Sequence, residues 1–141
     1  MTAKLLSRRQ RVLRVRQSQH LLAVTETVRA RDEANSIASN AERLARVRAE
    51  LFTAEPQMGG TFAAYRELAD RLERAGKRLE GALYDAEKVI DEKRGLEVAA
   101  NREKEIAQRL MERAHERLEE QREARLAAIP RYRQMQSRGQ Q

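Results

Sequence analysis

His20 and His115 are the side chains best suited to acid–base or metal chemistry, and they are the only histidines in a chain of 141 residues without cysteine. The sequence contains no HExxH, no Cys/His ligand spacing and no glycine-rich phosphate loop. General acid–base catalysis needs a titratable group in a desolvated cleft, whereas the many acidic residues here alternate with basic ones, as on solvated helix faces. We therefore expect no enzyme, no catalytic residue, no cofactor and no metal site.

The Gly59-Gly60 pair before Thr61 could begin a helix that binds an anion, but a chain reversal explains it better. Pro56 lacks a backbone donor and restricts Glu55 before it. Glycine permits the positive φ that a reversal often needs, and Thr61 can cap the helix that follows. The segment predicts a turn near the middle of the chain.

The composition predicts helices on both sides of this turn. Charged residues make up 36% of the chain and aromatic residues 4%, which is typical of long helices or coiled coils and not of a compact core. We expect one all-α coiled-coil domain, residues 1–141, folded as a long two-helix antiparallel hairpin. Its parts are a helix at about 5–54, a loop at 55–60, a helix at about 61–128 that Pro130 ends, and a basic tail at 129–141.

The second helix has the clearer heptad pattern. Steps of three and four from Tyr65 give a seam that is apolar at most positions, which indicates a left-handed coiled coil. Leu83, Ile90, Ile106 and Leu118 flank this seam, and the glycines at 76, 81 and 95 lie off it. The seam positions are Tyr65, Leu68, Leu72, Ala75, Leu79, Ala82, Ala86, Val89, Lys93, Leu96, Ala100, Glu103, Ala107, Leu110, Ala114, Arg117, Gln121 and Ala124. Its polar members either extend their charged ends to water or fix the register.

The first helix is less regular. One good stretch has Ile37, Ala41, Leu44, Arg48 and Leu51, and a looser stripe has Leu13, Leu21, Val24 and Val28, which Thr25, Thr27, Asn35 and Ser36 weaken. With a short loop, paired residue numbers should add up to roughly 114, so that residue 5 lies opposite about residue 109. The second helix then continues unpaired, with Leu110, Ala114, Leu118 and Leu126 uncovered. A longer parallel dimer remains an alternative. The break at Pro56, Gly59 and Gly60 favours the hairpin over this dimer.

Charge is sorted along the chain. Residues 1–25 contain six cations and no acid, and residues 121–141 contain five arginines and one glutamate. The hairpin brings these basic ends together, while the loop end exposes Phe52, Met58, Phe62 and Tyr65. A basic end attracts an anionic surface. The first 25 residues contain no aromatic residue and Tyr132 is the only one in the C-terminal tail, so we expect no nucleic-acid partner.

The pattern resembles a known family, the flagellar export protein FliJ and its YscO-like relatives in type III secretion. The resemblance rests on chain length, on the basic start from Arg8 to Gln17 and on the break at Pro56 to Gly60. It also rests on the Arg-rich end after Ile129 and on the ladder that opens the second helix, which consists of Tyr65, Leu68, Leu72 and Ala75. It implies a cytoplasmic stalk, similar to the rotor shaft of rotary ATPases and peripheral at the inner-membrane face. Its implied partners are the hexameric export ATPase, the cytosolic domain of the export gate, and export chaperones.

The resemblance also implies two binding surfaces. The export-gate candidates are Tyr65, Leu68, Leu72, Ala75 and Leu79. The ATPase-binding candidates of the basic end are Arg8, Arg9, Arg11, Arg14, Arg16, Arg122 and Arg125. The gate candidates are also seam positions, so not all of them can serve both purposes.

Two readings outside export remain open: a structural or tethering coiled coil, and a basic protein that binds nucleic acid or a membrane surface. The resemblance does not distinguish a flagellar from a virulence system. No apolar run approaches the roughly 20 residues of a membrane span, and the N-terminus lacks the apolar segment of a signal peptide. The sequence therefore predicts a cytoplasmic protein without a transmembrane segment.

Overall fold

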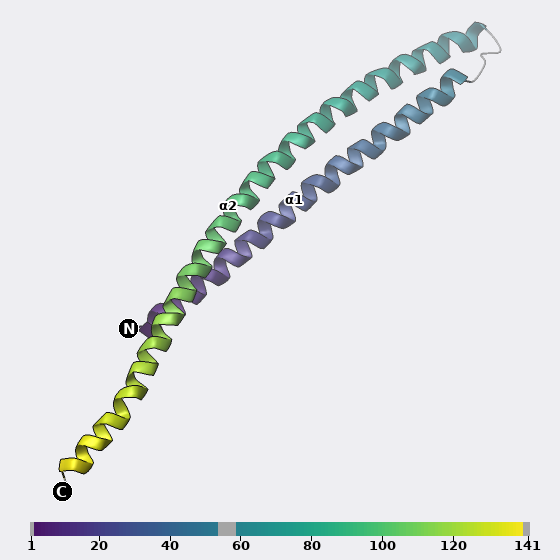
Figure 1. Cartoon of the computed structure of the whole chain (residues 1–141). Coiled ribbons are helices and arrows are strands. Elements are labelled where there is room, and N and C mark those ends of the chain that lie inside the picture. The colour runs from purple at the N-terminus through teal and green to yellow at the C-terminus, as the bar shows by residue number, and fades with distance from the viewer. Residues whose placement is uncertain (1, 54–58, 140–141) are drawn as a thin grey trace. The chain divides into compact units, whose positions relative to one another are not determined.

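The structure is a computed structural model that describes residues 2–53 and 59–139, without the side chains of 59–61, 130–135 and 137 (Figure 1). Helix α1 spans Thr2–Thr53 and helix α2 spans Gly59–Gly139, and the described residues contain no strand. The two helices pack against each other, which confirms the all-α two-helix hairpin. The predicted loop at 55–60 lies largely outside the described residues, as does Met58.

Both ends of α2 differ from the prediction. The helix begins at Gly59, before the Thr61 predicted to cap it, and no glycine among the described residues has a positive φ. At the other end, α2 does not stop at Pro130 but continues to Gly139. A proline removes one helical hydrogen bond, but the Arg, Gln and Met residues that follow it favour helix strongly. The predicted basic tail is therefore helical up to Gly139.

The packing divides the chain into two compact units, where the sequence predicted one coiled-coil domain. Unit 1 comprises Met1–Leu22 and Val98–Gln141, and unit 2 comprises Ala23–Glu97. Each unit contains a segment of α1 and a segment of α2.

In unit 2, the residues of α1 that face α2 follow one another at alternating steps of four and three. Every residue of this row is buried or half-buried, and the row consists of Ala23, Thr27, Ala30, Ala34, Ile37, Ala41, Leu44, Arg48 and Leu51. The predicted stretch from Ile37 to Leu51 is confirmed. The looser stripe is partly wrong, because Leu21 and Val28 are exposed while Thr27 is the most buried of the residues whose side chains the structure describes.

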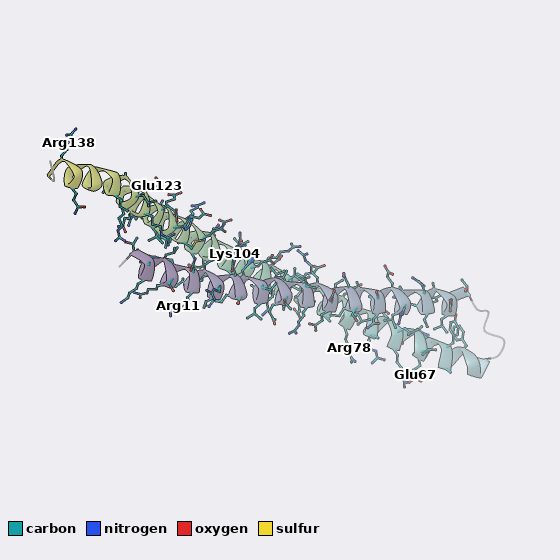
Figure 2. All side chains as sticks on the ribbon, turned by 90° about the horizontal axis from the view of Figure 1, so that it is seen from below. Arg11, Glu67, Arg78, Lys104, Glu123 and Arg138 are labelled. Carbon is teal, nitrogen blue, oxygen red and sulfur yellow. The ribbon has the colours of Figure 1, made fainter. Side chains whose placement is uncertain are left out.

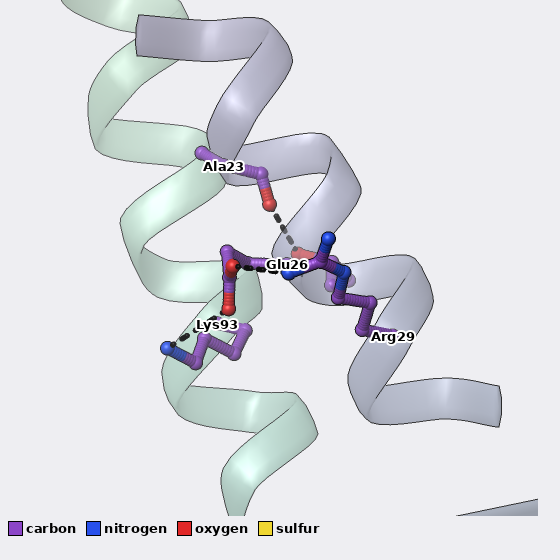
Figure 3. Close-up of polar contacts among 5 residues, drawn as sticks. Ala23, Glu26, Arg29 and Lys93 are labelled. Atoms are coloured by element: carbon purple, nitrogen blue, oxygen red, sulfur yellow. Dashed lines mark hydrogen bonds and ion pairs between the residues drawn. The ribbon is translucent and has the colours of Figure 1, made fainter. Parts of the chain in front are cut away.

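Thr27 shows how a polar residue occupies this seam. Its side chain is 2% exposed, and its hydroxyl donates a hydrogen bond to the Ala23 carbonyl oxygen at 3.0 Å (Figure 3). A hydroxyl that bonds the carbonyl four residues earlier is satisfied within its own helix, so its burial leaves no polar atom unpaired. The small residues Ala30 and Ala34, also buried, extend this narrow seam.

On α2, half of the predicted seam is correct. The heptad row that runs from Tyr65 through Leu72 and Leu79 to Ala114 is buried or half-buried as expected. In the second predicted row Ala75, Ala82 and Leu110 are half-buried too, but the continuous row lies one residue later. Leu68, Val89 and Leu96 are exposed. The second row is instead made by the half-buried residues Ala69, Gly76, Leu83, Ile90, Glu97, Lys104, Met111 and Leu118. Leu83, Ile90 and Leu118 are thus on the seam, while Ile106 is exposed.

The register of unit 2 also differs from the prediction. A Cβ at Gly76 would lie 3.7 Å from Leu44 Cδ2, and Lys93 Nζ lies 3.7 Å from Glu26 Oε2 (Figure 3). Paired residue numbers therefore add up to 119 or 120 and not to roughly 114. Counting from Leu44 and Gly76, Thr53 falls opposite Glu67. The first two turns of α2 thus extend beyond the end of α1, which the short-loop estimate could not anticipate.

In unit 1, the pairing continues further along α2 than predicted. The Thr2 hydroxyl donates to Gln121 Oε1 at 2.7 Å, so α2 is paired as far as Gln121. Leu110 and Leu118 are half-buried and Ala114 is buried, which contradicts the prediction that all three are uncovered. Of that group only Leu126 is exposed, because it lies beyond the start of α1.

Candidate docking surfaces

All seven arginines predicted to bind the ATPase belong to unit 1. Arg8, Arg11, Arg14, Arg122 and Arg125 are exposed, and Arg11 can be followed in Figure 2. Arg9 and Arg16 are half-buried on the seam row of α1, where their aliphatic stems pack while the guanidinium groups reach solvent. Unit 1 therefore offers a largely exposed set of cations contributed by the two ends of the sequence.

The pairing of these arginines is limited. Arg16 Nη2 lies 3.5 Å from Glu103 Oε2, and Arg16 also donates to Gln19. Arg122 Nη1 pairs with Glu119 Oε1 at 3.1 Å within the same helix. Exposed pairs of this kind contribute at most about 1 kcal/mol, so these arginines can exchange their carboxylates for those of a partner.

A groove in unit 1 gathers further cations that the sequence did not assign to the site. Its volume is about 490 Å³, and it is lined by Thr2, Lys4, Leu5, Arg8, Arg117 and Gln121. Arg117 was predicted to interrupt the seam, but it is exposed because the second seam row runs through Leu118. Only the register places Arg117 beside Arg8, so the sequence offered no signal for this grouping.

The export-gate candidates all lie in unit 2, and most of them are used in packing. Tyr65, Leu72 and Leu79 occupy a seam row and Ala75 is half-buried. Only Leu68 is exposed, at 45%. The five residues therefore do not form one open surface.

An aromatic patch in unit 2 is more accessible. Phe52 and Phe62 are both exposed, and with Tyr65 they line a groove of about 390 Å³. The guanidinium carbon of Arg48 lies 5.6 Å from the centroid of the Phe52 ring, a cation–π contact. Phe62 is exposed because it lies in the turns of α2 that extend beyond α1.

Other kinds of site have no support within the described ranges. There, no group of three or more His, Cys, Asp or Glu residues could hold a metal ion. Nor does any helix in the described part of the chain have a segment both long enough and apolar enough to cross a membrane.

Comparisons with known proteins add no relative. No protein-family model, curated protein or solved structure matches this chain.

Proposed function

We propose that this protein is a non-catalytic coiled-coil component of a flagellar or type III protein export apparatus. In this proposal, unit 1 binds the hexameric export ATPase and the aromatic end of unit 2 binds the export gate. The chain acts as a stalk and as an escort for export chaperones, in the cytoplasm and peripheral at the inner-membrane face. The observation that carries the proposal is the gathering of all seven candidate arginines in one compact unit.

The chemistry of unit 1 suits a partner that presents carboxylates. Arginine stays charged at all physiological pH values and binds carboxylates through two parallel hydrogen bonds. Within the described part of the chain, Arg8, Arg11 and Arg14 form no ion pair. These side chains lose no intramolecular pair when a partner binds, so a partner's carboxylates would add to the stability of the complex.

The chemistry of unit 2 suits an apolar partner. Its groove combines three aromatic rings with two arginines and with the acids Asp70 and Glu73. Aromatic and arginine side chains dominate the energetics of many protein interfaces. Because Leu72, Ala75 and Leu79 are half-buried and do not line this groove, we assign the gate contact to Phe52, Phe62 and Tyr65 and to the exposed Leu68.

Charge reversal at three exposed arginines tests the ATPase contact. The triple variant Arg8→Glu, Arg11→Glu, Arg14→Glu should weaken binding to the export ATPase hexamer by roughly 100-fold, because like charges placed across an interface cost several kcal/mol. Binding would be measured by surface plasmon resonance at fixed ionic strength. Arg9 and Arg16 are left unchanged, since their stems contribute to packing.

The matched control reverses three exposed arginines of unit 2, in the variant Arg66→Glu, Arg74→Glu, Arg78→Glu. It carries the same change in net charge and should retain affinity within about threefold. Undiminished binding by the unit 1 variant, or an equal loss in both variants, would contradict the proposed contact.

A further inference from the structure

Helix α1 of unit 1 carries a second stripe beside the buried seam. Its seam positions are Leu6, Arg9, Leu13, Arg16 and His20, all buried or half-buried. The residues that directly precede these seam positions follow the same alternating steps of three and four. They form a stripe that is rotated from the seam by about 100° around the helix axis. They are Leu5, Arg8, Val12, Val15 and Gln19, and the next step of the stripe is Leu22.

The apolar members of this stripe are open to solvent. Val12 is 42% exposed, Val15 56% and Leu22 65%, while Leu5 is half-buried. Single exposed apolar residues are common, but a stripe at heptad spacing resembles a coiled-coil seam that lacks a partner. The stripe is therefore fit to pack against another helix.

Helix α2 carries a matching stripe in unit 1. The residues one position before its seam row are Glu103, Ile106, Leu110, Arg113 and Arg117, of which Ile106 is 51% exposed and Leu110 half-buried. The two stripes lie on the same side of the helix pair, since Leu5 and Arg8 line one groove together with Arg117. We call this side the groove face of unit 1.

Apart from the exposed Leu21, the opposite side of unit 1 is polar. The residues one position after the seam on α1 are Ser7, Gln10, Arg14, Gln17 and Leu21, and those on α2 are Glu105, Gln108, Glu112, His115 and Glu119. The side chains of Gln108 and Glu112 hydrogen-bond to each other along this side. The apolar stripe of unit 1 therefore lies on the groove face, and a partner helix would pack there.

The charge of the groove face selects the partner. Arg8, Arg113 and Arg117 lie on it and Lys4 lines its groove. Of its two acids, Glu103 is already paired with Arg16 and Glu120 lies one position before Gln121, so cations are in excess. A second copy of this chain would bring the same cations and be repelled. The face has no aromatic residue, and aromatic residues are typical of helices that lie in a lipid surface. An acidic helix complements both its apolar stripe and its charge.

We propose that the groove face of unit 1 binds an acidic amphipathic helix of a partner protein, which packs as a third helix against Val12, Val15 and Ile106. The partner's apolar residues recur at heptad spacing, and its flanking glutamates or aspartates pair with Arg8, Arg113 and Arg117. This inference does not depend on the export apparatus, because it rests on the apolar stripe and not on the identity of the partner.

The test uses a synthetic helix as a probe. A fluorescent peptide of about three heptads, with Leu at seam positions and Glu beside them, is titrated with the full chain, and binding is followed by anisotropy. The same composition in scrambled order, and the same pattern with Lys in place of Glu, are the peptide controls. The acidic amphipathic peptide should bind at least tenfold more tightly than either.

Variants of the chain locate the site. Val12→Glu with Val15→Glu should weaken binding at least tenfold, and the milder Val12→Ala with Val15→Ala should weaken it about threefold. The matched control, Gln10→Glu with Gln17→Glu, makes the same change in net charge on the polar side and should stay within about threefold. Circular dichroism checks that each variant remains helical.

Several outcomes would overturn the proposal. Equal affinity for the scrambled peptide, or an equal loss in the two glutamate variants, would indicate attraction by charge alone. Binding of phosphatidylserine vesicles, but not of the acidic peptide, would assign the face to lipid. Self-association that Val12→Glu abolishes would assign it to a second copy. The ATPase measurement above can fail without affecting this result, because the peptide assay contains no ATPase.

Discussion

Ala114→Asp should lower the free energy of unfolding by about 3 kcal/mol or more, because it places a carboxylate in the seam of unit 1. Ala114 is 3% exposed and lies between the half-buried Met111 and Leu118 on α2. A buried ion without a partner loses its hydration, and the narrow seam leaves little room for water to follow it. The measurement is urea unfolding followed by circular dichroism at 222 nm.

Ala124→Asp is the matched control on the same helix. The heptad pattern places Ala114 and Ala124 on one seam, whereas in the structure Ala124 is exposed. Its replacement should cost only the lower helix propensity of aspartate, about 0.7 kcal/mol or less. Equal unfolding midpoints for the two variants would contradict a seam that buries Ala114 and ends near Gln121.

Replacing three glycines of α2 by alanine should raise the free energy of unfolding by about 2–3 kcal/mol. Gly76, Gly81 and Gly95 are all helical and lie in unit 2, and each interior Gly→Ala change contributes about 0.8–1 kcal/mol through backbone entropy. At Gly81 and Gly95 the added methyl meets nothing within 4 Å, and at Gly76 it makes an ordinary contact with Leu44. The melting temperature should rise by on the order of 10 °C.

Gly139→Ala is the control for this series, since Gly139 is the last residue of α2 and a helix end gains little from alanine. It should change the melting temperature by less than about 2 °C. A loss of stability in Gly76→Ala alone would mean that the seam is closer there than the Leu44 contact indicates. A loss in all three single variants would contradict a continuous α2.

The sequence predicted the helices and the break between them because these features are local. The charged, aromatic-poor composition favours helix on both sides of Pro56, but Gly59 and Gly60, which were predicted to belong to the loop, begin α2. One seam row of α2, from Tyr65 through Leu72 to Leu79, also follows from heptad spacing alone. None of these features depends on which residue of α1 lies opposite.

The second seam row could not be predicted because the sequence offers two apolar choices at several steps. Leu68 competes with Ala69, and Val89 competes with Ile90. The row in the structure also passes through Gly76, Glu97 and Lys104, which an apolar pattern passes over. The fit against α1 decides between the two rows, and this fit is not encoded in the periodicity of α2.

Thr27 was missed for a related reason. A threonine in a seam counts against an apolar stripe, but its hydroxyl has a partner in the Ala23 carbonyl of the same helix. A β-branched residue four positions after an alanine, in a row of small residues, is the signal that could have identified it.

The docking surfaces were predicted by composition but not by position. Counting charges identifies the basic ends of the chain, and the structure keeps the predicted arginines together in unit 1. The exposure of each arginine, and the grouping of Arg8 with Arg117, depend on a register that the loop length misjudged. Four of the five gate candidates are half-buried because they also lie on or beside the seam, as their heptad spacing indicated.

Disulfide formation between Leu44→Cys and Gly76→Cys tests most directly the antiparallel pairing on which this account rests. The native chain has no cysteine, so any disulfide must join the two introduced residues. The close approach of Leu44 to Gly76 brings the two positions near the separation that a disulfide requires. On mild oxidation we expect a rapid intramolecular disulfide, whereas Leu44→Cys with Ala69→Cys, close to the register first estimated, should stay reduced. Disulfides between molecules alone, or faster closure of the pair at residues 44 and 69, would contradict the account.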